Sequence, residues 1–315
     1  MIELRTSGAV IDGRYRVLRP LGQGAFAVTY EAVELATGRR VAVKEAPFDW
    51  APEKSPLEGL EREAVVLRSL RHPGIPGYVD SFECRSNARG SFFLVQELAP
   101  GASLWERLQG GESFGERDLK ELARELLTVL SYLHGRRRPL IHRDVKPSNI
   151  IRSARGTVAL VDFGAAQEAG QNDPSSLSDG TRGYMAPEQI RGRATPASDL
   201  YGLGATLIFL LTRVEPAQLP TRRGQIEFRV LAPVSREFGA WLDSLVEPEL
   251  SRRVPTAAAA LARLNQLDAR ASRRRHLAVR ALALAALTAA GVATLYAAPE
   301  LAGSPAHAAE PDPSD

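Results

Sequence analysis

The spacing of apolar residues divides the chain into a strand-rich first part and a helical second part. In residues 15–98, two apolar, partly β-branched runs flank a glycine-rich turn in "YRVLRPLGQGAFAVTYEAVE", and "RRVAVKEA", "GYVDSFEC" and "SFFLVQEL" also read as strands. Between them, "LEGLEREAVVLRSLRH" carries apolar residues at helical spacing and stops before Pro73. The first part is therefore predicted to be a sheet of about five strands with one helix.

Helical spacing dominates residues 101–264. The stretch "ERDLKELARELLTVLSYLHG" is amphipathic and ends in glycine, whereas "SDLYGLGATLIFLLT" is apolar nearly all round, as in a helix surrounded by protein. Two short strand-like pieces, "NIIRS" and "TVALVDFG", lie between these helices. The second part is therefore predicted to be mainly helical.

The end of the chain has a different character. Residues 281–298 are 18 consecutive uncharged positions, and including 277–279 extends the stretch past Arg280 to the length of about 20 residues that crosses a bilayer. Basic residues at 273–275 precede it and acidic residues follow it, so the positive-inside rule predicts a basic cytoplasmic linker over 265–276, a single-pass helix over 277–298 and an extracytoplasmic tail over 299–315. Because alanine is only marginally apolar, a buried or surface-lying helix is the alternative.

Composition and charge exclude some classes of function. With 44% hydrophobic and 24% charged residues, the chain has ordinary globular composition. The net charge of +3 is small and the basic residues are scattered, which argues against a nucleic-acid partner. The single cysteine, Cys84, excludes an intramolecular disulfide and a cysteine-based zinc site, and it fits a reducing compartment.

The stretch "HRDVKPSN" contains the side chains that phosphoryl transfer requires. Asp144 can accept the proton of a substrate hydroxyl, Lys146 supplies a cation for the transferring phosphoryl group, and Asn149 offers a neutral oxygen to magnesium. Asp162 of "DFG" follows as an anionic magnesium ligand. The order and spacing of these residues predict a phosphoryl-transfer site.

A second group of residues in the first part of the chain suits nucleotide phosphates. In "GQGAFA" the small residues Gly22 and Gly24 let backbone N–H groups approach a phosphate, although Ala27 stands at the third position where glycine would be more permissive. Lys44 ends the next strand in "VAVK", and Glu63 on the following helix can fix its ammonium toward the phosphates.

Taken in order, these motifs resemble those of the eukaryotic-type serine/threonine protein kinases, in their bacterial branch. The resemblance covers residues 15–264 and includes "GTRGYMAPE" and Asp199 of "SDLYGLG". Lys146, two residues after Asp144, resembles serine/threonine rather than tyrosine kinases. The resemblance implies an α+β, bilobal kinase fold, with a small, mainly β N-lobe over 15–98 and a larger, mainly helical C-lobe over 99–264. It also implies that Arg252 or Arg253 pairs with Glu188.

The resemblance further implies ATP as cofactor, with Mg²⁺ or, as an alternative, Mn²⁺. Val28, Ala42 and Ile151 would sandwich the adenine, Gln96 would gate the back of its pocket, and the hinge would pair with its edge. The full implied nucleotide-binding set is Leu21, Gly22, Gly24, Val28, Ala42, Lys44, Gln96, Glu97, Leu98 and Ile151. The implied reaction transfers the γ-phosphate of ATP to Ser/Thr hydroxyls of proteins, this chain included, in signalling at a bacterial cell membrane with the kinase domain in the cytoplasm.

Two other functions are weighed against this one. A pseudokinase serving as a membrane-tethered scaffold would have lost catalytic residues, whereas all are present and Ala27 is the only departure. A small-molecule phosphotransferase would not explain "GTRGYMAPE", which resembles the peptide-docking segment of protein kinases. The protein kinase interpretation is therefore preferred.

The segment between "DFG" and "APE" is polar and long, and we expect phosphorylation there to switch activity on. Arg143 could bind a phosphoserine formed at one of the candidates Ser175, Ser176 and Ser178. The alternative is that Asp173 or Asp179 already supplies the negative charge. Thr181 is assigned by resemblance to the peptide-docking turn, beside Asp144 and Lys146.

His142 is expected to be structural, and "GRRRPL" to be a solvated loop, with a basic docking patch as the alternative.

Overall fold

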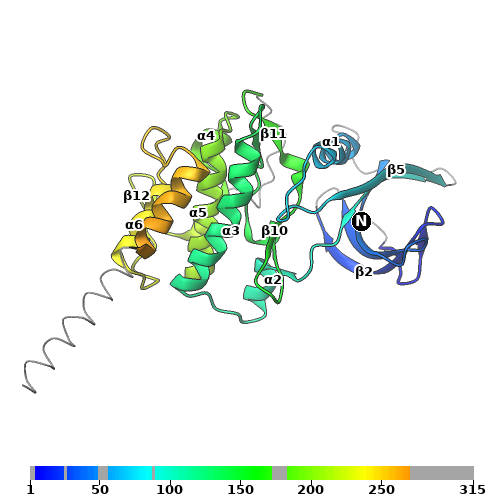
Figure 1. Ribbon diagram of the computed structural model, residues 1–315, viewed down its shortest axis with the longest axis horizontal. Coiled ribbons are helices and arrows are strands. Elements are labelled where there is room, and N and C mark those ends of the chain that lie inside the picture. The colour runs from blue at the N-terminus through cyan, green and yellow to red at the C-terminus, as the bar shows by residue number, and fades with distance from the viewer. Residues whose placement is uncertain (1–3, 25–26, 49–55, 87–88, 172–182, 270–315) are drawn as a thin grey trace, which may run out of the picture. The chain divides into compact units, whose positions relative to one another are not determined.

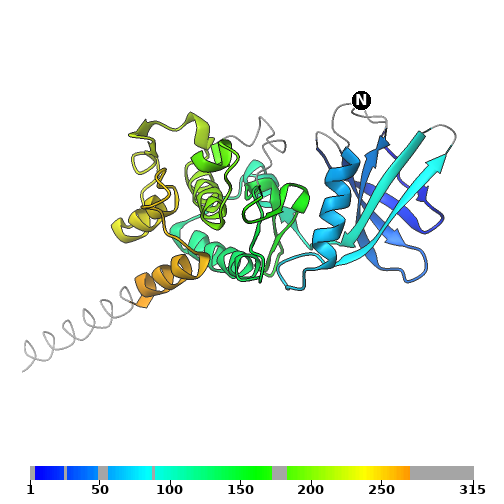
Figure 2. The ribbon, with the colours of Figure 1, turned by 90° about the horizontal axis from the view of Figure 1, so that it is seen from above.

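The computed structural model describes residues 4–24, 27–48, 56–86, 89–171 and 183–269, in two units, Met1–Leu264 and Asn265–Asp315. Of the second unit, residues 265–269 are described, and they are helical. Figure 1 and Figure 2 show the sheet and the helices of the first unit.

The first part of the chain forms one antiparallel sheet in the order β1-β2-β3-β4-β6-β5. Its strands are β1 (Val10–Ile11), β2 (Tyr15–Gln23), β3 (Val28–Glu34), β4 (Arg40–Pro47), β5 (Tyr78–Ser86) and β6 (Arg89–Glu97). Five of them lie where the apolar pattern predicted strands, and β1 adds an edge strand beside β2. The sheet curls, as Figure 2 shows, and on one face it encloses a core that includes Tyr15, Tyr30, Val43 and Phe93.

Helix α1 (Pro56–Arg68) carries a glutamate on its buried face. Leu60, Ala64 and Leu67 are all at most 3% exposed, and Glu63 lies among them at the same helical spacing with 1% exposure. The apolar residues that dock the helix therefore also fix the carboxylate of Glu63 inside the protein.

The second part is built around two long helices. α3 (Glu116–His134) is amphipathic, whereas α5 (Pro196–Thr212) is buried at every position from 197 to 210, as its apolar sequence predicted. The other helices are α2 (Leu104–Gln109), α4 (Pro187–Ile190), α6 (Arg236–Leu245) and a helical stretch that includes residues 257–264. Figure 1 shows α3, α5 and α6 among the helices of this part.

Short strands bring the predicted catalytic segments together. β7 (Ala102–Ser103), β9 (Ile150–Arg152) and β10 (Val158–Leu160) form one sheet, and β8 (Leu140–Ile141) pairs with β11 (Gln167–Glu168). The 3₁₀ turns are η2 (Pro147–Asn149), η3 (Phe163–Ala165) and η6 (Pro216–Gln218), and β12 (Thr221–Arg222) pairs with β13 (Gln225–Ile226). Gly101, at φ 118°, permits this arrangement because a Cβ there would lie 2.1 Å from the carbonyl oxygen of Arg152.

A buried ion pair braces the helical part, and the structure decides which arginine makes it. The fully buried side chain of Arg253 donates to both carboxylate oxygens of Glu188, at 2.6 and 3.0 Å. Arg252 instead pairs with Glu249 at the surface. Burial by itself would raise the pKa of Glu188, but the hydrogen bonds from Arg253 and Ser198 together with the charge of Arg253 outweigh it, and the pKa is lowered.

Among the described residues, no helix combines the length and the apolar character needed to cross a membrane. The stretch 277–298, for which a span was predicted, lies outside the described residues, as do the linker from residue 270 onward and the tail.

Candidate active site

Asp199 of α5 holds the loop that carries Asp144. The backbone N–H groups of His142 and Arg143 donate to its two carboxylate oxygens, each at 2.8 Å. Arg143 adopts a left-handed conformation at φ 69°, which is unfavourable for a non-glycine residue, and its carbonyl accepts a bond from Gln189 at 2.6 Å. These bonds hold the strained turn immediately before Asp144.

His142 lies under this loop, as predicted. It is fully buried, its ring meets Phe163 edge to face at 4.8 Å, and its Nδ1 accepts the backbone N–H of Asp144 at 3.3 Å. Burial lowers the pKa of His142, which favours a neutral ring that can accept that bond. Its role is therefore to position the loop.

Lys146 and Asn149 both contact one carboxylate oxygen of Asp144. The ammonium of Lys146 and the amide nitrogen of Asn149 each lie 2.8 Å from Oδ2 of Asp144. Among the described residues, no hydrogen bond is made to Oδ1 of Asp144. The cation and the amide therefore fix the orientation of the Asp144 carboxylate.

Lys44 joins the sheet to the helical part of the protein. Its Nζ lies 2.7 Å from Oε2 of Glu63 and 2.7 Å from Oδ1 of Asp162, and the other oxygen of Glu63 accepts the backbone N–H of Phe163 at 3.2 Å. The ammonium of Lys44 lowers the pKa of Asp162 to about 2. Burial raises the pKa of Glu63, and Lys44 opposes that shift. The structure thus brings Lys44, Glu63 and Asp162 together, and of these contacts the sequence predicted the one between Lys44 and Glu63.

The oxygen donors Asn149 and Asp162 fit a divalent metal ion. The two segments are joined because the carbonyl of Asn149 accepts the N–H of Val161 at 2.9 Å, and Asp162 keeps 42% of its side chain exposed. Among the described residues no group of three or more His, Cys, Asp or Glu side chains could hold a metal ion. Phosphate oxygens and water would therefore have to complete the coordination, which is the mode that Mg²⁺ prefers.

One residue predicted to contact adenine, Val28, does not lie on the face of the sheet that carries Lys44. Val28 pairs across to Glu45 and is fully buried in the core on the far face of the sheet. Its neighbour Thr29 pairs with Lys44 and therefore shares the face of Lys44 and Ala42. Because successive strand residues point to opposite faces, the expected contact of Val28 with adenine does not fit this arrangement, and Thr29 rather than Val28 shares the face of Lys44.

The remaining predicted nucleotide-site residues lie in the large sheet, at its glycine turn, after β6 and in the small sheet of the second part. Gln96 pairs with Ala42, and the side chain of Glu97 turns outward to Arg39 at 2.6 Å while its backbone N–H donates to the carbonyl of Gly77 at 2.8 Å. Ile151 is half-buried beside Ser103 in the small sheet. The other predicted residues are half-buried Leu21 and Leu98 and, at the glycine turn, Gly22 and Gly24. Of that turn, residues 25–26 lie outside the described residues.

A positioning residue that the sequence analysis missed is His134, at the end of α3. Its Nε2 lies 2.9 Å from the same oxygen of Asp199 that accepts the N–H of His142. It therefore helps to orient the carboxylate that anchors the catalytic loop. Local sequence carries no signal for this contact, because His134 and Asp199 are 65 positions apart.

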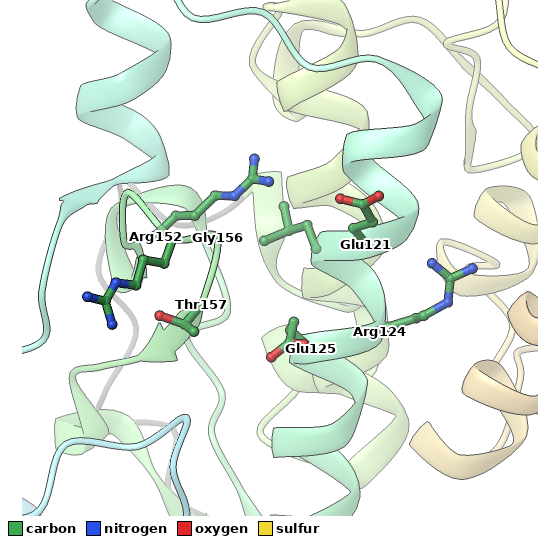
Figure 3. Close-up of a pocket in the computed structure, with 8 residues that line it drawn as sticks. Glu121, Arg124, Glu125, Arg152, Gly156 and Thr157 are labelled. Atoms are coloured by element: carbon green, nitrogen blue, oxygen red, sulfur yellow. The ribbon is translucent and has the colours of Figure 1, made fainter.

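Two hollows of the described structure lie apart from these residues. A cavity of about 320 Å³ is bordered by Glu121, Glu125 and Arg152 between α3 and the turn after β9, as Figure 3 shows. Neither it nor a second cavity beside Trp105 is lined by Lys44, Asp144 or Asp162. The site is therefore identified by its chemistry rather than by the volume of a cavity.

The basic run "GRRRPL" is partly engaged in the fold. Arg136 donates to Ser69, and Arg138 pairs with Glu168 at 3.3 Å. Arg143 donates to the side-chain oxygen of Gln167 at 2.5 Å.

The phosphorylation candidates Ser175, Ser176 and Ser178, together with Asp173, Asp179 and Thr181, lie outside the described residues.

Comparison with known proteins agrees with this chemistry. Residues 15–261 match the protein kinase domain family. The chain is 35% identical over 264 residues to the serine/threonine-protein kinase PknA of Nostoc sp., an alignment that covers 79% of this chain and 46% of that protein. It is 36% identical over 268 residues to the serine/threonine-protein kinase C of Synechocystis sp., covering 79% and 49%. The chain spans about half the length of these two curated relatives. It belongs to the protein kinase family, and the predicted resemblance to the eukaryotic-type serine/threonine kinases of bacteria is confirmed.

Proposed function

We propose that this chain is an ATP-dependent protein serine/threonine kinase. The observation that carries the proposal is the position of Lys44, 2.7 Å from both Glu63 and Asp162, in the same structure as the Asp144–Lys146–Asn149 cluster. A scaffold without catalysis would have no need of this set of charges. The kinases named for Nostoc and Synechocystis support the same function.

In the proposed reaction, the substrate hydroxyl oxygen attacks the γ-phosphorus of ATP while the bond to the bridging oxygen breaks and ADP leaves. Oδ1 of Asp144 orients the hydroxyl and accepts its proton. Lys146, 2.8 Å from Asp144, stabilises the negative charge of the transferring group, and Lys44 holds the phosphates of the nucleotide. The chemistry is therefore mainly positioning and electrostatic stabilisation.

Asn149 and Asp162 would hold Mg²⁺, or alternatively Mn²⁺. A divalent ion supplies charge neutralisation and orientation of the phosphates in this reaction. Because Lys44 keeps the pKa of Asp162 at about 2, this carboxylate is ionised at neutral pH and ready to act as a ligand.

The function is tested by incubating the purified full chain with labelled ATP, magnesium and casein, followed by identification of the phosphorylated amino acids. We expect label on serine and threonine, and none when Asp144→Asn replaces the parent chain. If the parent chain neither binds nor consumes ATP with magnesium or with manganese, the pseudokinase scaffold is favoured.

We also propose that phosphorylation between "DFG" and "APE" raises activity. A phosphate near Arg143, which directly precedes Asp144, would make charge-assisted hydrogen bonds and order the loop. We expect mass spectrometry after incubation with ATP to find phosphate on Ser175, Ser176 or Ser178. The triple alanine variant should then be slower by about 5- to 150-fold. A triple variant as fast as the parent would show that Asp173 or Asp179 supplies the charge.

We further propose that residues 277–298 anchor the chain in the bacterial cell membrane, with the kinase domain in the cytoplasm and residues 299–315 outside. The support is the uncharged sequence preceded by basic residues, and the need of the domain for cytosolic ATP. We expect the full chain to sediment with membranes and a chain lacking residues 277–315 to remain soluble. Recovery of the full chain in the soluble fraction would contradict the anchor.

A further inference from the structure

A carboxylate occupies an apolar position next to Lys44. On β4, Val41, Val43 and Glu45 point to the same face of the sheet, because alternate strand residues share a face. The two valines are fully buried, and Glu45 itself is 5% exposed. A buried carboxylate is unfavourable unless a cation and hydrogen bonds compensate for the lost water. A partner for Glu45 is therefore required on this face.

Arg5 is that partner. Its Nε and Nη2 donate to the two oxygens of Glu45, each at 2.7 Å, and the hydroxyl of Ser91 donates to one of them at 2.9 Å. The guanidinium also lies over the ring of Phe93, 5.3 Å from its centre. This two-pronged bond raises the pKa of Arg5, against the effect of burial.

The segment that presents Arg5 is tied to several strands, and we call residues 4–9 the N-terminal strap. The backbone N–H of Arg5 donates to the hydroxyl of Tyr30 on β3 at 3.2 Å. At the other end of the strap, Gly8 and Ala9 exchange backbone hydrogen bonds with Val17 on β2, at 2.9 and 2.8 Å. Together with Glu45 on β4 and Phe93 on β6, these contacts reach four neighbouring strands. The strap precedes residue 15, where the match to the kinase family begins.

We propose that Arg5 is a positioning residue for nucleotide binding. It acts by holding Glu45 on one face of β4, while on the other face Lys44 binds Glu63 and Asp162 and holds the phosphates of the nucleotide. This inference rests on the proposed kinase function. Lys44 and Glu45 share one peptide unit, and the ammonium of Lys44 must stay within hydrogen-bonding distance of both Glu63 and Asp162. A displacement of about 1 Å is enough to weaken such a site. Loss of Arg5 would leave Glu45 buried without its cation, and the strand would move to bring that carboxylate to water.

The test compares five full-length chains: the parent, Arg5→Met, Arg5→Lys, the double variant Arg5→Met with Glu45→Met, and Arg14→Met as the matched control. Arg14 also pairs with carboxylates of this sheet region, Asp12 and Asp80, but those residues lie outside β4. The measurements are the KM for ATP, the KM for casein, kcat, the Kd of a fluorescent ATP analogue, and Tm.

We expect Arg5→Met to raise the KM for ATP and the Kd of the analogue by about 2- to 30-fold, with the KM for casein unchanged. Arg5→Lys should lie between Arg5→Met and the parent, because an ammonium restores the charge but not the two-pronged geometry. The double variant should recover most of the affinity, since it removes the buried charge together with its partner. Arg14→Met should match the parent in nucleotide binding.

A fall in Tm without a change in KM or Kd would show that the strap is only structural and would overturn the inference. Equal weakening of nucleotide binding by Arg14→Met and Arg5→Met would overturn it too. If Arg5→Met fails to fold, Arg5→Lys and the double variant decide the matter, and parent-like affinity in Arg5→Lys contradicts the proposal. A parent chain that binds the analogue but transfers no phosphate would refute the proposed function, while the Kd values would still test the strap.

Discussion

Replacing Asp144 by asparagine should remove most of the kinase activity and leave ATP binding in place. The amide cannot accept the proton of the substrate hydroxyl, and general base catalysis contributes about 10²- to 10⁴-fold to rate. The oxygen of asparagine can still accept the bonds that Lys146 and Asn149 now make to Oδ2 of Asp144, so the loop should keep its shape. We therefore expect kcat to fall by that factor with little change in the KM for ATP.

The measurement is transfer of labelled phosphate to casein over a range of ATP concentrations, with Tm measured for each chain. The control is Asp12→Asn, which removes the same charge from a carboxylate that is 42% exposed and pairs with Arg14. This control should retain parental rates. An Asp144→Asn chain with parental kcat would mean that Asp144 does not handle the proton.

Replacing Lys44 by methionine should impair both nucleotide affinity and turnover. The ammonium of Lys44 is the cation between Glu63 and Asp162, and one such preorganised group is worth about 10²- to 10³-fold in kcat. The KM for ATP should rise as well, unlike in Asp144→Asn. Lys120→Met is the matched control, because Lys120 also pairs with a glutamate, Glu116, but on the first turns of α3. An active Lys44→Met chain would contradict the proposed phosphate contact.

We also expect Lys44→Met to change how the stability of the fold depends on pH in the acid range. Because Lys44 lowers the pKa of Asp162 to about 2, the ion pair stabilises the fold above the unfolded pKa of about 3.9 and loses this contribution as the pH falls toward 2. In Lys44→Met that contribution is missing throughout. We expect the urea midpoints of parent and variant to differ at neutral pH and to converge between about pH 4 and pH 2. Parallel curves over this range would show that the pair does not set the pKa of Asp162.

Much of the fold could be predicted because its signals are local. The helical spacing in α1, α3 and α5 and the strand pattern in β4 and β6 depend on residues only a few positions apart. The catalytic segment could also be predicted, since Asp144, Lys146 and Asn149 lie close together in the sequence. In the structure Lys146 and Asn149 contact the same oxygen of Asp144. The edge strand β1, only two residues long, carried no pattern of its own and was not predicted.

The assignment of faces in the sheet was less readable. A strand pattern does not say which of two neighbouring residues lies on which face of the sheet, and here the pairing of β3 with β4 puts Thr29 on the face of Lys44 and Val28 in the core. The partner of Glu188 was likewise left between two adjacent arginines. Only the burial of Arg253 and the exposure of Arg252 distinguish them.

The sequence by itself thus determined the order of the elements, the family and the side chains that can transfer a phosphoryl group. Only the tertiary structure decided that Lys44 meets Asp162, 118 positions away, and that Arg5 meets Glu45, 40 positions away. The physical reason is that periodicity records which residues share a face of one helix or strand. Contacts between distant segments depend on strand pairing and helix packing, because these place side chains to within hydrogen-bonding distance only once the whole core has formed.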